Sequence, residues 1–252
     1  MKLQVVDNLI IKIHKTRLLL GAEAALMVCA KIRHLLAQQE AVNIIFASAP
    51  SQNEFLDALV EVADIDWGRV NAFHMDEYIE LPKNDPRSFA TFLNKKIFNL
   101  LPFRTVNYIN GNAAEIGAEC KRYTKLLAQF PADIICLGIG ENGHLAFNDP
   151  HVAYFNDLSM VKMVKLDAEC RQQQVNDGCF AGLNEVPAYA ITLTIPALMA
   201  AKFIYCIVPG KNKAKAIKNT LQNEIIEKYP STILRKHANA VLFLDRGSSS
   251  LL

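Results

Sequence analysis

Three short segments of the sequence concentrate polar side chains that could transfer protons or bind an anion. They cover residues 48–53, 74–78 and 140–149. Imidazole and carboxylate groups can pass protons to and from a substrate near neutral pH. Backbone N–H groups at the start of a helix favour a phosphate. Together the segments supply groups for general acid–base catalysis and a weak cradle for an anion.

The second segment places two acids side by side after an apolar run. Asp76 and Glu77 are consecutive, and consecutive side chains of an extended chain point to opposite sides. Only one of them can therefore face a cleft, so we predict that one is a general base and the other a structural partner. Two solvated loop carboxylates are the simpler alternative. No His-Glu-x-x-His motif, paired-cysteine motif or cluster of three acids indicates a metal, and we expect none.

The third segment has the spacing of a dinucleotide-binding fingerprint from Gly138 to Gly143. That fingerprint requires a helix at its third glycine, and Pro150 ends the following run too soon for one. We therefore expect no nicotinamide cofactor. The glycines, Gly140 among them, predict a turn that lets the backbone approach a ligand closely. This turn would expose His144 and Asp149, although a plain hydrogen-bonded loop histidine remains the alternative.

Two further groups could bind an anion. Ser48, Ser51 and Gln52 precede a predicted helix, without the glycines or the lysine of a Walker motif, so a nucleoside triphosphate is not expected. Lys213 lies near another predicted helix start, where a cation is unfavourable unless an anion offsets its charge. A solvated lysine is the alternative there.

Strands and helices alternate along the chain and predict where these segments lie. Hydrophobic patterning predicts seven strands at residues 43–47, 70–73, 106–109, 133–139, 189–195, 203–208 and 240–244. Helices are predicted between them, at residues 16–38, 88–98, 113–130, 212–222 and 231–237, and one that Ser51 and Glu54 open as a capping box. This alternation predicts one α/β domain over residues 1–252, with a doubly wound, mostly parallel sheet of about seven strands and helices on both faces, Rossmann-like. Ligands of such sheets bind beyond the carboxyl ends of the strands, where the polar segments fall.

The composition is that of a globular protein: 51% hydrophobic and 21% charged residues, with 27 basic and 25 acidic side chains. The net charge of +2 and the scattered lysines give no footprint for nucleic acid. No apolar run approaches the roughly twenty residues of a membrane span, and no secretory signal is visible, so we expect a cytoplasmic protein. The six cysteines have no metal-ligand spacing and are expected to be reduced core residues. A homo-oligomer stays open, because helix faces used for assembly look like core faces.

The order and spacing of these segments resemble the glucosamine-6-phosphate deaminase (isomerase) family, which is related more distantly to the 6-phosphogluconolactonases. The resemblance spans roughly residues 40 to 245. It is carried by residues 73–78 with Leu81 and Pro82, and by residues 138–150, 186–190 and 210–214. Tyr78 and the pair Phe147-Asn148 favour the deaminase branch, because the lactonases usually show Asp-Glu-Arg and a Gly-His-Thr type sequence at these places.

The resemblance implies a reaction without cofactor that converts glucosamine 6-phosphate and water into fructose 6-phosphate and ammonia. It implies that His144, supported by Asp149, relays a proton at the ring oxygen. It also implies that Asp76 moves a proton between C2 and C1. Lys213 and the loop around Ser51 would hold the phosphate.

Three departures from the family pattern bear on the substrate. Residues 47–52 replace a Gly-Ser-Thr phosphate loop, and Asn142 stands where many relatives have an aspartate that could balance an imidazolium. Residues 176–180 lack an arginine that relatives offer to the phosphate, for which Arg171 is a substitute. The epimer and the release of ammonia therefore stay open. A lactone hydrolase and a non-catalytic sugar phosphate sensor are the alternatives.

Overall fold

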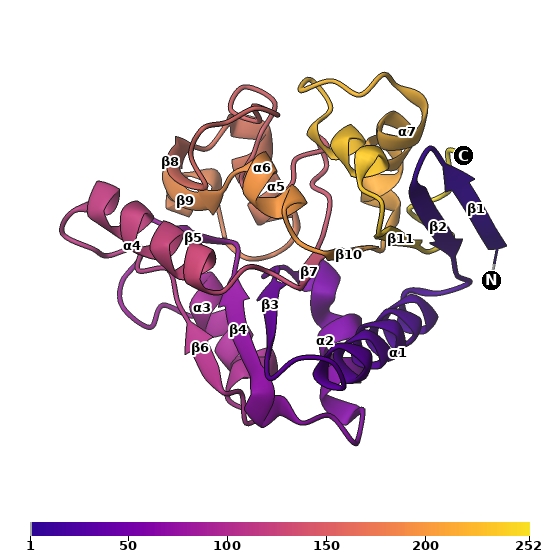
Figure 1. Cartoon of the computed structure of the whole chain (residues 1–252). Helices are drawn as coiled ribbons and strands as arrows, with labels where there is room; N and C mark the ends of the chain where they lie inside the picture. Colours follow the sequence, from indigo (N-terminus) through magenta and orange to yellow (C-terminus); the bar gives the residue numbers. More distant parts are fainter. Residues whose placement is uncertain (1) are drawn as a thin grey trace.

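An eight-stranded sheet forms the centre of the computed structural model, which describes residues 2–252 (Figure 1). Its order is β1-β2-β11-β10-β7-β3-β4-β6, and every pair is parallel except β1 and β2. The predicted α/β fold with a mostly parallel sheet is thus confirmed. The strands are β1 (Lys2–Val6), β2 (Leu9–Ile13), β3 (Val42–Phe46), β4 (Val70–His74), β6 (Thr105–Asn107), β7 (Ile134–Leu137), β10 (Phe203–Val208) and β11 (Ala240–Leu244).

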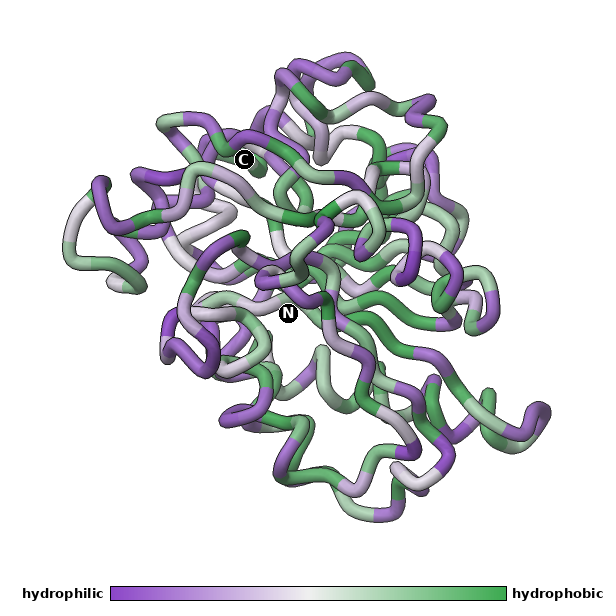
Figure 2. Tube along the Cα trace, turned by 90° about the vertical axis from the view of Figure 1, so that its left-hand side faces the viewer, coloured by the Kyte–Doolittle hydropathy of each residue, from purple (hydrophilic) through white to green (hydrophobic). Residues whose placement is uncertain are grey.

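Helices cover both faces of this sheet, as Figure 1 shows for α1 and α2 on one side and α6 and α7 on the other. Side chains of β3 alternate accordingly: Ile44 and Phe46 join the core under α1 and α2, and Ile45 joins the opposite core. Figure 2 shows hydrophobic residues along the central strands. The helices are α1 (Arg17–Leu36), α2 (Asn53–Glu61) and α3 (Phe89–Leu93) with the π-helical turn η3 (Asn94–Phe98), and α4 (Ile116–Gln129), α6 (Ile195–Met199) and α7 (Ala214–Gln222).

A second, three-stranded antiparallel sheet has the order β5-β9-β8. Its strands are β5 (Asp76–Tyr78), β8 (Val161–Lys165) and β9 (Tyr189–Leu193). The prediction that residues 189–195 belong to the main sheet is therefore wrong. The apolar run of β9 correctly indicated a buried strand, but periodicity alone does not say which sheet buries it. The N-terminal hairpin β1-β2 takes the main sheet beyond the predicted strands.

The predicted capping box of Ser51 and Glu54 is wrong. The chain enters α2 through a single 3₁₀ turn, η1 (Pro50–Gln52), which has no side-chain cap. The Ser51 hydroxyl instead accepts a hydrogen bond from Nε2 of Gln52 (3.2 Å), and Glu54 pairs with Arg17 across to α1 (2.9 Å). Ser51 therefore keeps its side chain at the end of the sheet instead of on the helix backbone.

The six cysteines are free thiols, and four of them are buried: Cys29, Cys136, Cys170 and Cys206. None of the helices within residues 2–252 combines the length and the apolar character that crossing a membrane requires.

Candidate active site

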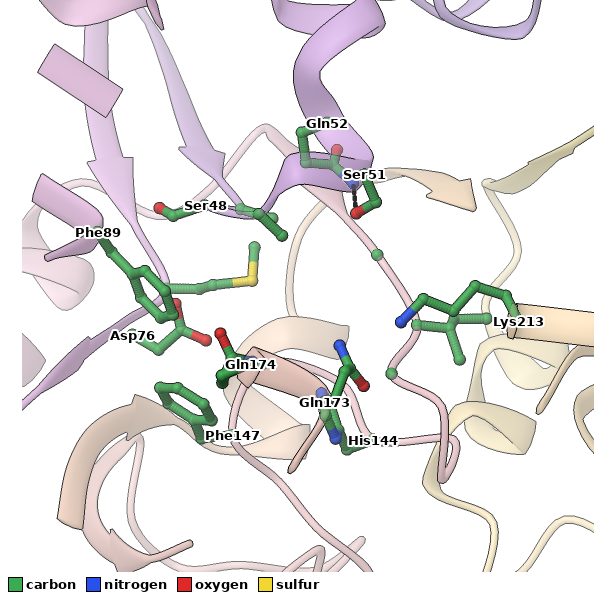
Figure 3. A pocket seen from close by; sticks show the side chains of 17 residues that line it. Ser48, Ser51, Gln52, Asp76, Phe89, His144, Phe147, Gln173, Gln174 and Lys213 are labelled. Carbon is green, nitrogen blue, oxygen red and sulfur yellow. Dashed lines mark hydrogen bonds between the residues drawn. The ribbon is translucent and has the colours of Figure 1, made fainter. Parts of the chain in front are cut away.

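A cavity opens at the carboxyl ends of β3, β4 and β7, where the polar segments were predicted to meet (Figure 3). It contains about 490 Å³ of space free of protein atoms, part of it open to solvent. The lining side chains that could act on or bind a ligand are Ser48, Ser51, Gln52, Asp76, Phe89, His144, Phe147, Gln173, Gln174 and Lys213.

Asp76 and Glu77 point to opposite sides of β5, as their adjacency predicts. The carboxyl group of Asp76 lines the cavity and is 6% exposed. The carboxylate of Glu77 lies behind it at the start of α3. It accepts hydrogen bonds from the N–H groups of Tyr78 (2.9 Å), Phe89 (3.1 Å) and Ala90 (2.8 Å). Glu77 is thus the structural partner of the pair and not a substrate-binding residue, because the protein backbone already uses its oxygens.

Burial raises the pKa of both carboxyl groups. It raises the pKa of Asp76 well above its ordinary value of 3.8, and the adjacent charge of Glu77 raises this pKa further. Burial likewise raises the pKa of Glu77 to about 7, although three backbone hydrogen bonds oppose the shift. A base with a pKa near the working pH is the most effective one. The environment of Asp76 therefore suits a general base.

His144 is held by a small polar network behind the cavity. Its Nδ1 lies 3.1 Å from Oδ1 of the fully buried Asp149. Asn142 braces both residues: its Nδ2 donates to Oδ1 of Asp149 (3.0 Å), and its Oδ1 accepts from the backbone N–H of His144 (3.0 Å). Burial alone would raise the pKa of Asp149, but contacts with His144, with Asn142 and with the backbone N–H of Asp167 lower it. Asp149 is therefore a carboxylate that orients the imidazole.

Gly140 lies directly against the ring of His144. A Cβ atom built on Gly140 would lie 2.2 Å from Cε1, 2.3 Å from Nε2 and 2.5 Å from Cδ2 of His144. The predicted glycine turn is present, since Gly143 has a φ of +88° and its N–H donates to the carbonyl of Gly140 (3.0 Å). The turn thus makes room for the imidazole and presents it to the cavity.

Lys213 supplies a buried cation at the other end of the cavity. It comes from the 3₁₀ turn η5 (Lys211–Lys213) after β10, is 4% exposed, and forms no ion pair with the residues that the structure describes. Burial lowers its pKa, while the charges of Asp177 and Glu141 act in the opposite direction. Figure 3 shows its ammonium group pointing into the cavity across from Ser51.

Two polar atoms in the loop of residues 48–52, which lines the same cavity, also lack partners in the part of the chain that the structure describes. They are the buried hydroxyl of Ser48 and Oε1 of Gln52. Burying a cation or a polar atom without a partner is costly, and a bound ligand can offset that cost. The Lys213 end of the cavity therefore fits an anionic group such as a phosphate.

Arg171 does not reach the cavity, which corrects the prediction that it substitutes for a phosphate-binding arginine. Its Nη2 donates to the carbonyl groups of Leu183 (2.7 Å) and Val186 (2.8 Å) and so ties helix α5 (Ala168–Asn176) to the following loop. Two other residues of α5, Gln173 and Gln174, line the cavity instead.

Hydrophobic patterning does not predict α5, and so it gives no signal for these glutamines. That helix lacks an apolar stripe, and its buried face consists of Cys170, Gln173 and Gln174. One signal was available: Asp167 is a good N-cap residue, and its carboxylate accepts from the N–H of Cys170 (2.6 Å).

Two groups of side chains have the spacing to hold a metal ion. Ligand atoms of His144, Asp149 and Cys170 lie within 4.8 Å of one another, and so do those of Asp149, His151 and Asp167. The first group belongs to the network that orients the imidazole, so its geometry has an explanation without an ion. The expectation of a site without metal stays a prediction.

A family model for glucosamine-6-phosphate isomerases and 6-phosphogluconolactonases matches residues 16–243 of this chain. The chain belongs to this family. A glucosamine-6-phosphate deaminase of Streptococcus sanguinis (strain SK36) is 35% identical over 214 residues, which cover 85% of this chain and 88% of that protein. One of Bacillus cereus (strain B4264) is 36% identical over 187 residues, covering 74% of this chain and 70% of that protein.

Solved structures of the glucosamine-6-phosphate isomerase/6-phosphogluconolactonase family share this architecture. A monomeric glucosamine-6-phosphate deaminase superposes with a TM-score of 0.88 at 27% identity, covering 96% of this chain and 99% of its own. A 6-phosphogluconolactonase from Thermotoga maritima superposes with a TM-score of 0.76 at 19% identity, covering 94% and 99%. The second comparison shows a common fold only. The sequence similarity to named deaminases confirms the family resemblance.

Proposed function

We propose that this chain converts glucosamine 6-phosphate and water into fructose 6-phosphate and ammonia. The observation that carries the proposal is the convergence of Asp76 and His144, from loops after different strands, on one cavity whose far end holds the unpaired Lys213. The similarity to proteins named glucosamine-6-phosphate deaminases supports the same reaction.

Each proposed step has a group in place for it. The imidazole of His144, oriented by Asp149 and Asn142, relays a proton at the ring oxygen and opens the sugar. The carboxylate of Asp76 then takes the proton from C2, and a proton delivered to C1 leaves an imine at C2. Water adds to this imine and ammonia departs, which leaves the ketose. These steps are proton transfers and a hydrolysis, so the proposal calls for no cofactor.

Binding of the phosphate positions the reacting carbons. Lys213 would pair with the phosphate, and the groups of Ser48, Ser51 and Gln52 would complete its hydrogen bonds. Binding energy from this remote end can orient C1 and C2 against Asp76, which lowers the barrier without any contact at the reacting atoms.

An assay of ammonia release from glucosamine, galactosamine and mannosamine 6-phosphates tests the proposal and identifies the epimer. A parallel measurement of acid release from 6-phosphogluconolactone covers the lactone hydrolase. Acid without ammonia, or calorimetric binding of all three hexosamine phosphates without turnover, would each reject the proposed reaction in favour of the lactone hydrolase or the sensor.

Replacing Lys213 with Met is expected to separate binding from stability. Loss of the only cation lining the described cavity should weaken fructose 6-phosphate binding by about 10–100-fold, the value of a charge-assisted contact. Removing a buried, unpaired charge should at the same time raise the free energy of unfolding by about 1 kcal/mol or more. Calorimetry and urea unfolding measure the two effects. The exposed Lys211, changed to Met, is the control, and tight binding in Lys213→Met would place the phosphate elsewhere.

The pH dependence of kcat/KM should report the environment of Asp76. The base must be ionised, so kcat/KM falls as the pH falls through its pKa, and burial places this limb above the ordinary value of 3.8. Glu77→Gln removes the adjacent charge, which also raises that pKa, and should move the limb to lower pH. Rates between about pH 4 and 9 would show the shift. The exposed Glu80, changed to Gln, should leave the limb in place; a shift to higher pH in Glu77→Gln would contradict the assignment.

A further inference from the structure

We propose that Gln174, together with Asp76, binds the amino group of the substrate and makes this site prefer amino sugar phosphates to their hydroxyl counterparts. The inference rests on the proposed function and names the residue that selects its substrate class.

The two adjacent glutamines of α5 differ in what their amides contact. Oε1 of Gln173 accepts from the N–H of Glu141 (2.7 Å), and its Nε2 approaches the carboxylate of Asp177 (3.3 Å), so this amide braces the loop that carries His144. The amide of Gln174 forms no hydrogen bond with any residue that the structure describes, although the residue is only 8% exposed. A side-chain amide offers two donors and an acceptor with two lone pairs. Gln174 lines the cavity, and Figure 3 shows its side chain next to Asp76.

The position of Gln174 fits the reacting end of the sugar. Figure 3 shows that Gln174 lies beside Asp76, whereas Lys213 lies on the opposite side of the cavity. A hexose 6-phosphate whose phosphate pairs with Lys213 and whose C2 faces Asp76 would therefore place its C2 substituent near Gln174. In the proposed substrate this substituent is the amino group.

The chemistry of this end suits a cationic substituent. An ammonium group has three donors and no acceptor, so it needs acceptors, and Asp76 and Oε1 of Gln174 supply them. Phe89 and Phe147 line the same end, stacked on each other 5.4 Å apart, and this apolar wall keeps water away from a hydrogen bond to the amine. The cavity thus has a positive end for the phosphate and an acceptor-rich end for the amine.

Binding of unreactive sugar alcohols tests this inference without turnover. The ligands are 2-amino-2-deoxyglucitol 6-phosphate and glucitol 6-phosphate, which differ only in the amino group, and calorimetry gives both dissociation constants. The wild type should prefer the amino ligand by about tenfold or more, as expected for a charge-assisted hydrogen bond. Gln174→Met keeps the length of the side chain and should reduce this preference to about twofold, while binding of glucitol 6-phosphate changes by less than about threefold.

Two further variants make the test decisive. Gln172→Met alters an exposed residue of the same helix and should keep the full preference. Gln174→Glu retains the acceptors and adds a charge, so it should keep or increase the preference even where the Met variant folds poorly. A wild type without preference, a preference retained in Gln174→Met, or an equal loss for both ligands would overturn the inference. A wild type that prefers the amine and releases no ammonia would reject the proposed reaction alone.

Discussion

Asp76→Asn is expected to lower the rate of ammonia release by about 10²–10⁴-fold, because the variant keeps the shape of the side chain and loses the base that takes the C2 proton. The carboxyl group makes no hydrogen bond to the residues that the structure describes and faces the cavity, so the amide fits the same place. The loss should appear in kcat as well as in kcat/KM, since the base acts on bound substrate.

The same variant should be at least as stable as the wild type at neutral pH. Burial raises the pKa of Asp76 above 3.8, so the folded protein binds the proton more tightly than the unfolded chain does. Such a carboxyl group lowers the free energy of unfolding as the pH rises above its unfolded pKa. A neutral Asn removes that cost, and thermal unfolding at acidic and neutral pH would show a flatter pH dependence in the variant.

The control for Asp76→Asn is Asp57→Asn, an exposed position on α2. It should change neither turnover nor the pH dependence of stability. Wild-type turnover in Asp76→Asn would remove this carboxylate from the mechanism, and a lowered melting temperature would assign it a structural role.

Local rules were enough to predict where the candidate cavity lies. Side chains of β3 alternate between the two cores because strands have a period of two, and the consecutive placement of Asp76 and Glu77 predicts that they serve opposite sides. The carboxyl-end rule for parallel sheets then brings the loops that carry Asp76 and His144 to one cavity. These inferences depend on geometry within a few residues, which the sequence states directly.

Long-range pairing explains what the sequence could not predict. β9 pairs with β5 across more than a hundred positions of the chain and with β8 across only 24 to 32, and nothing in its apolar run encodes either partner. Arg171 looked suited to a phosphate because it is a cation near the expected place. Its guanidinium turns away because two carbonyl groups of the next loop accept from it. The role of Gln174 could not be predicted for the complementary reason. A neutral amide does not by its type indicate a binding site, and only the structure shows that this one lines the cavity.

Gly140→Ala is expected to reduce turnover by about 10²–10⁴-fold, as much as removal of the imidazole itself. Its new methyl group would meet three ring atoms of His144 at 2.2–2.5 Å, which is far below van der Waals contact. The ring is a side chain and can rotate away, so the fold should survive while the imidazole leaves Asp149 and the cavity. Ammonia release and thermal unfolding measure the two effects. Gly117→Ala on α4 is the matched control: a Cβ there meets nothing within 4 Å, so it should preserve turnover and add about 0.5–1 kcal/mol of stability.

A double-mutant cycle separates this mechanism from general damage to the loop. If Gly140→Ala acts only by displacing the imidazole, then adding it to His144→Ala costs nothing further, because no ring remains for the methyl group to displace. Losses that multiply in the double variant would mean that the glycine serves the reaction through its own backbone, by close approach to the substrate, and not through His144. If the double variant is no slower than His144→Ala alone, then Gly140 acts by leaving room for the imidazole, which lets His144 keep its working position.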